Sequence, residues 1–167
     1  MNHQWKSIRE LIDLDEESPM DSDEFDTALW LLLCDKISSP ESLQRYELPV
    51  SVYYASRFLQ WEVGNGGFAQ AAYNIPEWFR LAADGYAKLE KPNAAQLIKD
   101  AMKLLPGERD ELERKGLFAA TIGSVFDHFR ESRMAALDDR IPEDEWWIDH
   151  ERVAYVRKHR DAFRALT

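Results

Sequence analysis

The chain turns sharply within Trp61-Glu62-Val63-Gly64-Asn65-Gly66-Gly67-Phe68-Ala69-Gln70-Ala71-Ala72-Tyr73-Asn74. Three glycines and one asparagine occupy four consecutive positions here, between two segments whose apolar residues have helical spacing. Glycine and asparagine tolerate a positive φ, which a sharp helix-to-helix corner requires. We therefore predict that a helix stops at Gly64 and that another follows the corner, with Phe68 in the core. The side chain of Glu62, Gln70 or Asn74 is expected to bond the exposed amides of the corner.

Apolar residues recur at helical spacing on both sides of this corner. Before it, Tyr54, Phe58 and Trp61 stand at i, i+4 and i+7. Earlier still, residues 22–34 are apolar nearly all round, which predicts the central buried helix. Alternation of period two is confined to residues 50–54, so no significant sheet is expected. The sequence predicts an all-α fold of about eight or nine helices in one compact domain, residues 1–167.

The composition excludes several classes of protein. The 167 residues include 21 Lys+Arg and 31 Asp+Glu, which gives a formal charge of −10. This balance argues against direct binding to nucleic acid, because such binding relies on basic residues that displace counterions, and it favours a basic protein partner. The one cysteine, Cys34, permits neither an intramolecular disulfide nor a multi-thiolate metal site and is expected in the core. No secretory signal and no membrane-spanning run are recognised, so we expect a cytoplasmic protein without a membrane partner.

The excess negative charge is concentrated in two short stretches. Residues 10–26 contain nine acids and no base, and residues 138–151 contain seven acids and one base. Residues 152–167 instead contain five bases and one acid, a net charge of +4. The stretches either keep the protein soluble or form an acidic surface that attracts a cationic partner. The candidate partner-binding residues are Asp13, Asp15, Glu16, Glu17, Asp21, Asp23, Glu24, Asp26, Asp138, Asp139, Glu143, Asp144, Glu145 and Asp149.

No catalytic or metal-binding constellation is expected from the spacing of the polar residues. The four histidines lack the spacing of a helical zinc protease, and His128 with Glu131 is interpreted as an exposed ion pair. Asp149, His150 and Glu151 are adjacent, so on a helix they point about 100° apart and do not converge on a metal. We predict no metal, no cofactor and no catalytic residue. The contrasting hypothesis is that the protein is an enzyme. Its active site would be a small polar pocket made by Glu62, Asn65, Gln70 and Asn74.

The corner segment also carries a family resemblance. It resembles the Glu-x-Asn-Asn-Gly-Gly-Phe…Gln…Asn signature of a bacterial domain-of-unknown-function family typified by an acidic DNA-mimic protein. The matching residues, read as a structural motif, are Glu62, Gly64, Asn65, Gly66, Gly67, Phe68, Gln70 and Asn74. Gly64 stands where the signature usually has asparagine. The likeness is specific over residues 58–79 and extends, in helix order and acidity, over about residues 25–165.

The resemblance implies an all-helical fold, dimerisation and an acidic surface that occupies the DNA-binding face of a transcription factor. A contact between two copies would use Trp146, Trp147 and the helix from Val153, unless the two tryptophans pack in their own core. The leading hypothesis is therefore a non-enzymatic regulator, a DNA mimic that binds a transcription factor or another basic DNA-binding protein. An immunity-type inhibitor of a basic nuclease toxin would use the same acidic surface and is the alternative.

The spacing of the acids makes mimicry physically feasible. Carboxylates at i, i+3 or i+4 on a helix lie about 5–6 Å apart, while duplex DNA presents one charge per ~1.7 Å of its axis when both strands are counted. Asp23 with Asp26, and Asp13 with Glu16 and Glu17, have this helical spacing. Two such rows would imitate two phosphate ridges if folding placed residues 10–26 beside residues 138–151.

Overall fold

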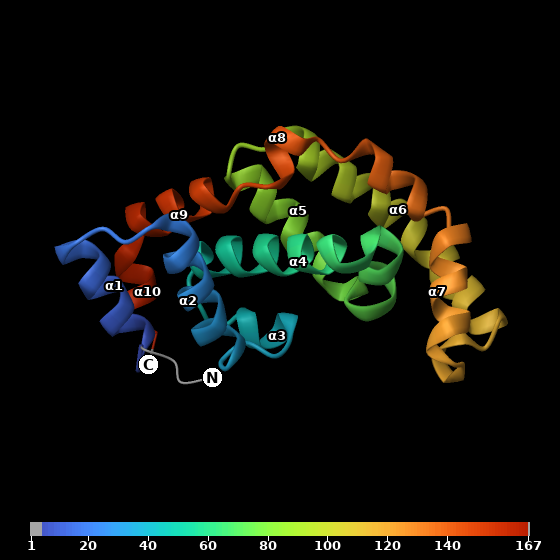
Figure 1. The fold of residues 1–167 in the computed structure, drawn as a ribbon, viewed down its shortest axis with the longest axis horizontal. Helices are drawn as coiled ribbons and strands as arrows, with labels where there is room; N and C mark the ends of the chain where they lie inside the picture. Colours follow the sequence, from blue (N-terminus) through green and yellow to red (C-terminus); the bar gives the residue numbers. More distant parts are fainter. Residues whose placement is uncertain (1–4, 167) are drawn as a thin grey trace.

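Helices form all the regular structure of residues 5–166, the part of the chain that the structure describes (Figure 1). In that part the computed structural model has ten α-helices and three short 3-10 helices (η), and no strand. The all-α prediction is confirmed, although the expected number of helices was too low because single-turn helices leave no periodic signal. The elements are α1 (Ile8–Glu17), α2 (Ser22–Cys34), α3 (Pro40–Leu43), α4 (Leu48–Asn74), η1 (Pro76–Trp78), α5 (Phe79–Lys88), α6 (Pro92–Arg114), η2 (Leu117–Ala119), α7 (Ile122–Glu131), η3 (Ala135–Arg140), α8 (Glu143–Trp146), α9 (Asp149–Lys158) and α10 (Arg160–Arg164).

The longest helix, α4, forms the axis of the molecule. In Figure 1 it runs horizontally through the centre, and it packs against α5, α6 and α9. Its side chains Val50, Tyr53 and Leu59 are completely buried. The prediction that residues 22–34 form the central helix was wrong, because α2 packs on α9 and on one end of α4 and leaves Trp30 partly exposed.

Two glycines bend α4 at the predicted corner, slightly later than expected. The helix continues past Gly64 and bends at Gly66 (φ −169°, ψ 26°) and Gly67 (φ 77°, ψ −179°). The backbone conformation of Gly67 is almost closed to residues that have a Cβ. Phe68 follows and is completely buried, as predicted. Its amide donates to Oδ1 of Asp138 at 2.9 Å, so the amide of Phe68 is capped by a distant residue and not by a residue of the motif.

An aromatic cluster packs the corner against the C-terminal segment. The ring of Trp146 lies 5.4 Å from that of Phe68 and 5.2 Å from that of Tyr86, between centroids. The Tyr86 hydroxyl also donates to the main-chain carbonyl of Trp146 at 3.0 Å. Trp146 is completely buried, whereas Trp147 is 51% exposed. Of the two alternatives left open for these tryptophans, packing in the protein's own core therefore holds for Trp146, whereas Trp147 stays on the surface.

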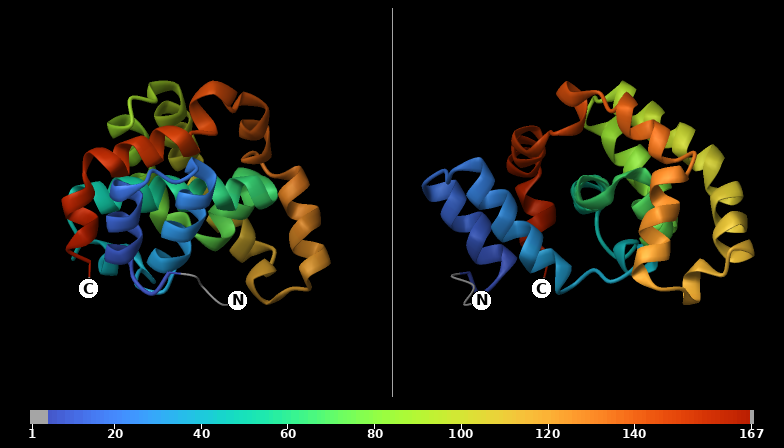
Figure 2. Two further views of the ribbon diagram at one scale, coloured as in Figure 1. Left: turned by 60° about the vertical axis from the view of Figure 1, so that its left-hand side comes forward. Right: turned by 45° about the vertical axis from the view of Figure 1, so that its right-hand side comes forward.

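The folded molecule is arched, and each end of the arch is formed by different helices. Helices α1, α2 and α10 lie together at one end, and α7 lies at the other (Figures 1 and 2). Cys34 is exposed at the end of α2, contrary to the expectation of a core position, because this helix buries Phe25, Leu29 and Leu33 instead. Between residues 5 and 166, no helix combines the length and the apolar character needed to cross a membrane.

Candidate acidic interface

Asp15, a predicted interface residue, is buried and paired with arginines of the C-terminal helices. Its exposed fraction is 0%. Arg157 donates to it from Nη2 (2.7 Å) and Nε (3.0 Å), and Arg160 donates from Nη2 (3.3 Å). Burial raises the pKa of Asp15, but the hydrogen bonds from Arg157 and from the Met20 amide outweigh burial and leave the pKa below its usual value. Asp15 holds α1 on α9 and α10 and is not available to a partner.

A second arginine contact uses two more acids of α1. Nε of Arg164 donates to Oδ1 of Asp13 at 2.7 Å, and its Nη2 donates to Glu16. The positive charge of residues 152–167 therefore neutralises α1, which the sequence separates from it by more than a hundred residues. Asp13 and Glu16, two of the three acids in the row that would imitate a phosphate ridge, therefore pair with an arginine of the same chain; Glu17 is the third.

The two acidic stretches come close where α2 packs on α9, which begins at Asp149. Asp26 is 2% exposed and accepts hydrogen bonds from Nε of Arg57 (2.8 Å) and from the hydroxyl of Tyr53 (2.9 Å). Asp149 pairs with Arg152, which is completely buried. Since Asp26 is enclosed, its predicted pairing with Asp23 in a surface row was wrong.

Two acids of the second stretch cap helices that are distant in sequence. Asp138 accepts from the Phe68 amide at the corner of α4, and burial raises the pKa of this carboxyl. Glu145 accepts from the amides of Asn93 (2.6 Å) and Ala94 (3.1 Å) in the first turn of α6. The first amides of a helix have no partner within the helix, so these carboxylates take the place of a local cap. No local sequence signal identifies them, because the capped residues lie 70, 52 and 51 positions away.

Replacing Glu145 with alanine is expected to lower the free energy of unfolding by about 1 kcal/mol, the usual cost of a lost cap. The matched change is Glu143→Ala, two residues earlier on the same helix, where the side chain is exposed. That change is expected to stay within about 0.5 kcal/mol of the wild type. Urea denaturation of both variants measures the difference, and equal values would show that Glu145 is not a cap.

Seven of the fourteen candidate acids are exposed and form no ion pair with any residue in the range 5–166. One group, the N-terminal patch, surrounds the start of α2, where Asp21 also caps the helix by accepting from the amides of Asp23 and Glu24. The other group, the C-terminal patch, lies on η3 and α8. The N-terminal patch is Glu17, Asp21, Asp23 and Glu24; the C-terminal patch is Asp139, Glu143 and Asp144.

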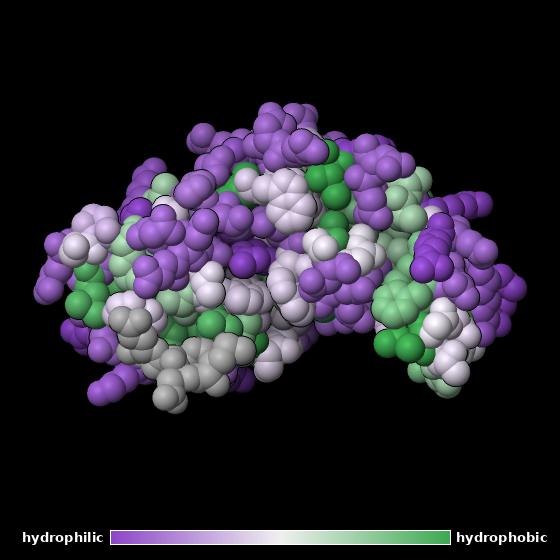
Figure 3. Space-filling model, viewed as in Figure 1, coloured by the Kyte–Doolittle hydropathy of each residue, from purple (hydrophilic) through white to green (hydrophobic). Residues whose placement is uncertain are grey.

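The patches are separate and do not form one strip. In Figure 1, α9 lies between the pair α1–α2 and the segment η3–α8, and the right-hand view of Figure 2 shows the same order. Figure 3 shows hydrophilic residues over both regions, with paler and apolar residues between them in the middle of the face. The condition under which two acidic rows would imitate two phosphate ridges, residues 10–26 beside residues 138–151, is therefore not met by the exposed acids.

The motif residues predicted for the alternative pocket bind mainly one another. Glu62 is buried, and its Oε2 accepts from Nδ2 of Asn74 (2.9 Å) and Nε2 of Gln70 (3.4 Å). Asn65 is exposed and does not join them. Gln70 and Asn74 also line a groove of about 190 Å³ whose other wall is apolar and belongs to α7. The Glu62 contacts tie the two halves of α4 together across the corner.

His128 has a different partner from the predicted one. It is buried, with Nε2 2.8 Å from Oε1 of Glu108 and Nδ1 3.2 Å from Nζ of Lys115. Glu108 also accepts from the hydroxyl of Ser132 at 2.7 Å. The interpretation as an exposed pair with Glu131 was wrong, and His128 instead ties α7 to α6. Across the described residues, no cluster of three or more His, Cys, Asp or Glu side chains is arranged to hold a metal.

Comparison with known proteins identifies a family. The family model described as DMP19-like protein matches residues 44–159, which is more than half of the chain. This segment contains the corner of α4 and the C-terminal patch but not the N-terminal patch. No curated protein and no solved structure matches the sequence. The chain therefore belongs to the DMP19-like protein family.

Proposed function

We propose that this protein is a non-enzymatic regulator that occupies the DNA-binding surface of a basic protein, with carboxylates in place of DNA phosphates. The observation that carries the proposal is the set of seven exposed acids that have no ion-pair partner in the described part of the chain. The family supports it, since its name refers to a DNA mimic protein. Unpaired surface carboxylates attract a cationic surface over a long range and speed its association.

The two patches indicate which parts of the surface would bind the partner, which the total charge of −10 does not. Five of the candidate acids, Asp13, Asp15, Glu16, Asp26 and Asp149, are paired with arginines of the same chain, so they add little to the field outside the molecule. Asp21 and Glu24 are three residues apart and exposed, so they have the helical spacing of neighbouring charges. A basic protein would therefore be held at two separated points, with the C-terminal patch lying in the family-matched segment.

Competition with DNA tests the mimicry directly. The protein is immobilised, proteins of the native host are captured at low ionic strength, and duplex DNA is then added at constant ionic strength. We expect DNA to release a DNA-binding protein, and we expect the free protein to displace DNA from that same partner. A captured partner that holds DNA and this protein together would contradict mimicry. Capture of a nuclease whose activity is blocked would favour the immunity-type function instead.

Paired substitutions test which acids bind the captured partner. Asp23→Asn with Glu24→Gln removes two charges from the N-terminal patch, and Glu143→Gln with Asp144→Asn removes two from the C-terminal patch. Each pair is expected to weaken binding about five- to thirty-fold at low salt, because charge-assisted contacts contribute about 1–2 kcal/mol in favourable cases. Isothermal titration or biosensor measurements at several salt concentrations provide the values.

The matched control removes the same charge elsewhere. Asp110 and Glu113 are exposed on α6, outside both patches. Asp110→Asn with Glu113→Gln changes the net charge from −10 to −8, as each patch variant does, so it measures the effect of total charge alone. Equal losses in all three double variants would show that the patches have no special role.

A further inference from the structure

Two exposed tryptophans lie on or against one face of α4: Trp61 belongs to this helix, and Trp147 lies against its Gly64. Trp61 and Gly64 are three residues apart on this helix and are therefore neighbours on its surface. A Cβ built on Gly64 would lie 3.3 Å from Cη2 and 3.6 Å from Cζ3 of Trp147, so the absence of a side chain at this position lets the Trp147 ring lie against α4. Trp61 is 46% exposed and Trp147 is 51% exposed. We call Trp61, Gly64 and Trp147 the aromatic face.

The core does not account for the exposure of these rings. Trp61 stacks on Phe58, with centroids 6.3 Å apart, but nearly half of its surface remains open. Trp146, the neighbour of Trp147 in the sequence, is completely buried in the core, whereas about half of the surface of Trp147 is exposed. Large exposed aromatic residues are typical of binding hot spots, and tryptophan and arginine are the residue types most enriched there.

The same helix already shows how an arginine is bound on this side of the molecule. The guanidinium carbon of Arg57 lies 5.5 Å from the centre of the Trp30 ring, while its Nε donates to Asp26 at 2.8 Å. One side chain thus combines a carboxylate contact with the face of a tryptophan. Such cation–π contacts are strongest with tryptophan.

Carboxylates also stand close to the aromatic face in the sequence, so a cation from outside the molecule could meet both a carboxylate and a tryptophan ring there. Glu143 and Asp144 stand one helical turn before Trp147, are exposed and form no ion pair with a described residue. We propose that the aromatic face binds an arginine side chain of the basic partner, with its guanidinium on Trp147 or Trp61 and with the C-terminal patch as the counter-charge. This inference rests on the proposed function and adds a contact that selects arginine-bearing surfaces among cationic ones.

A peptide titration tests the inference without any knowledge of the partner. The full-length protein is labelled with ¹⁵N, and the indole N–H signals of its tryptophans are followed by NMR as octa-arginine is added. We expect the signals of Trp61 and Trp147 to shift, and those of the buried Trp78 and Trp146 to stay in place. In Trp147→Leu the dissociation constant should rise about two- to five-fold, the size expected for one exposed cation–π contact. Trp147→Phe should retain part of the affinity, because a phenyl face remains.

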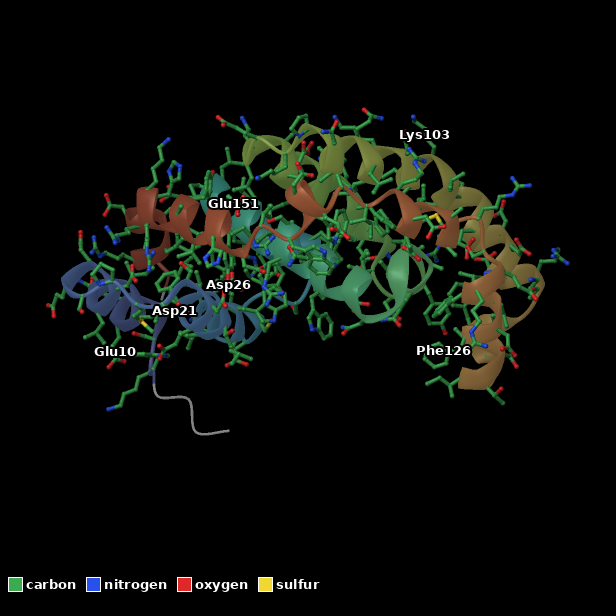
Figure 4. The ribbon with its side chains drawn as sticks, turned by 45° about the horizontal axis from the view of Figure 1, so that its top comes forward. Glu10, Asp21, Asp26, Lys103, Phe126 and Glu151 are labelled. Carbon is green, nitrogen blue, oxygen red and sulfur yellow. The ribbon has the colours of Figure 1, made fainter. Side chains whose placement is uncertain are left out.

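The control is Phe126→Leu, which removes an aromatic ring of similar exposure (46%, against 51% for Trp147) from α7. Figure 4 shows Phe126 far from the labelled acids Asp21 and Asp26. This variant is expected to bind octa-arginine like the wild type. The loss in Trp147→Leu should also be larger with octa-arginine than with octa-lysine, because the planar guanidinium stacks on aromatic rings.

Two results would overturn the inference. In the first, Trp147→Leu and Trp61→Leu both bind octa-arginine with unchanged affinity, while Glu143→Gln with Asp144→Asn weakens binding. The contact would then be purely ionic. The other is a shift of the partly buried Trp5 and Trp30 indoles as large as that of Trp61 and Trp147, which would indicate no preferred site. Either result leaves the proposed function standing, whereas failure to capture any DNA-binding partner would remove the proposed function and not the peptide contact.

Discussion

Replacing Gly67 with alanine is expected to lower the free energy of unfolding by about 2–4 kcal/mol, the cost of a Gly-only conformation plus the loss of a helix cap. At φ 77° and ψ −179° the backbone of Gly67 excludes a side chain. A Cβ there would also lie 2.3 Å from Oδ2 of Asp138, which caps the Phe68 amide. The new methyl group would therefore strain the corner and displace its cap together. Urea denaturation followed by circular dichroism measures the change.

Gly107→Ala is the matched control for this change. Gly107 lies within α6, and a Cβ built on it would meet nothing within 4 Å. Alanine is the better helix former by about 0.8–1 kcal/mol, so this variant is expected to be slightly more stable than the wild type. If Gly67→Ala were as stable as Gly107→Ala, the corner would not need glycine. In that case the conformation described for Gly67 would be wrong.

Replacing Asp15 with asparagine is expected to lower the free energy of unfolding by about 3 kcal/mol, near the lower end for a broken buried ion pair. The lower end applies because Arg157 and Arg160 keep about a quarter of their side-chain surface exposed to water. The variant leaves these two arginines facing a neutral side chain in a buried contact. Glu17→Gln on the same helix removes an equal charge from an exposed position and is expected to change stability by less than about 0.5 kcal/mol.

The loss at Asp15 should depend on pH in a defined direction. The pKa of Asp15 in the folded protein lies below its usual value, so the unfolded chain takes up the proton first as pH falls. The stability that Asp15 contributes is therefore fully present above about pH 5 and declines below about pH 4. The gap between wild type and Asp15→Asn should narrow over this acidic range. A gap that stayed constant down to the lowest pH at which both proteins fold would contradict the charge pairing.

The local pattern of the chain predicted its helices and its corner well. The run Gly64–Gly67 permits backbone conformations that other residues disfavour, and Phe68 carries a large apolar surface directly after it. Both effects act within a few residues, so they can be recognised without the rest of the fold. The position of α4 as the central helix was missed, because α2 has the more apolar composition and only packing shows which helix has neighbours on all sides.

The acidic surface was predicted only in part. Clustering of charge along the chain is visible in the sequence, but the partner of each carboxylate is not. Asp15 is separated from Arg157 by 142 positions, and Asp138 from the Phe68 amide by 70. The net positive charge of residues 152–167 was the available signal for the arginines that pair with α1, whereas no comparable signal marks a carboxylate that caps a distant helix.

By itself, the sequence determined the helical class, the place of the turn near Gly66 and the excess of negative charge, since these depend on composition and on neighbours a few residues apart. The tertiary structure alone decided which acids face water, because desolvation and pairing depend on groups brought together from distant parts of the chain. It enclosed Asp15 and Asp26, used Asp138 and Glu145 as caps, and left two exposed acidic patches and two exposed tryptophan rings. The surface offered to a partner is therefore smaller and more specific than the charge of the chain indicates.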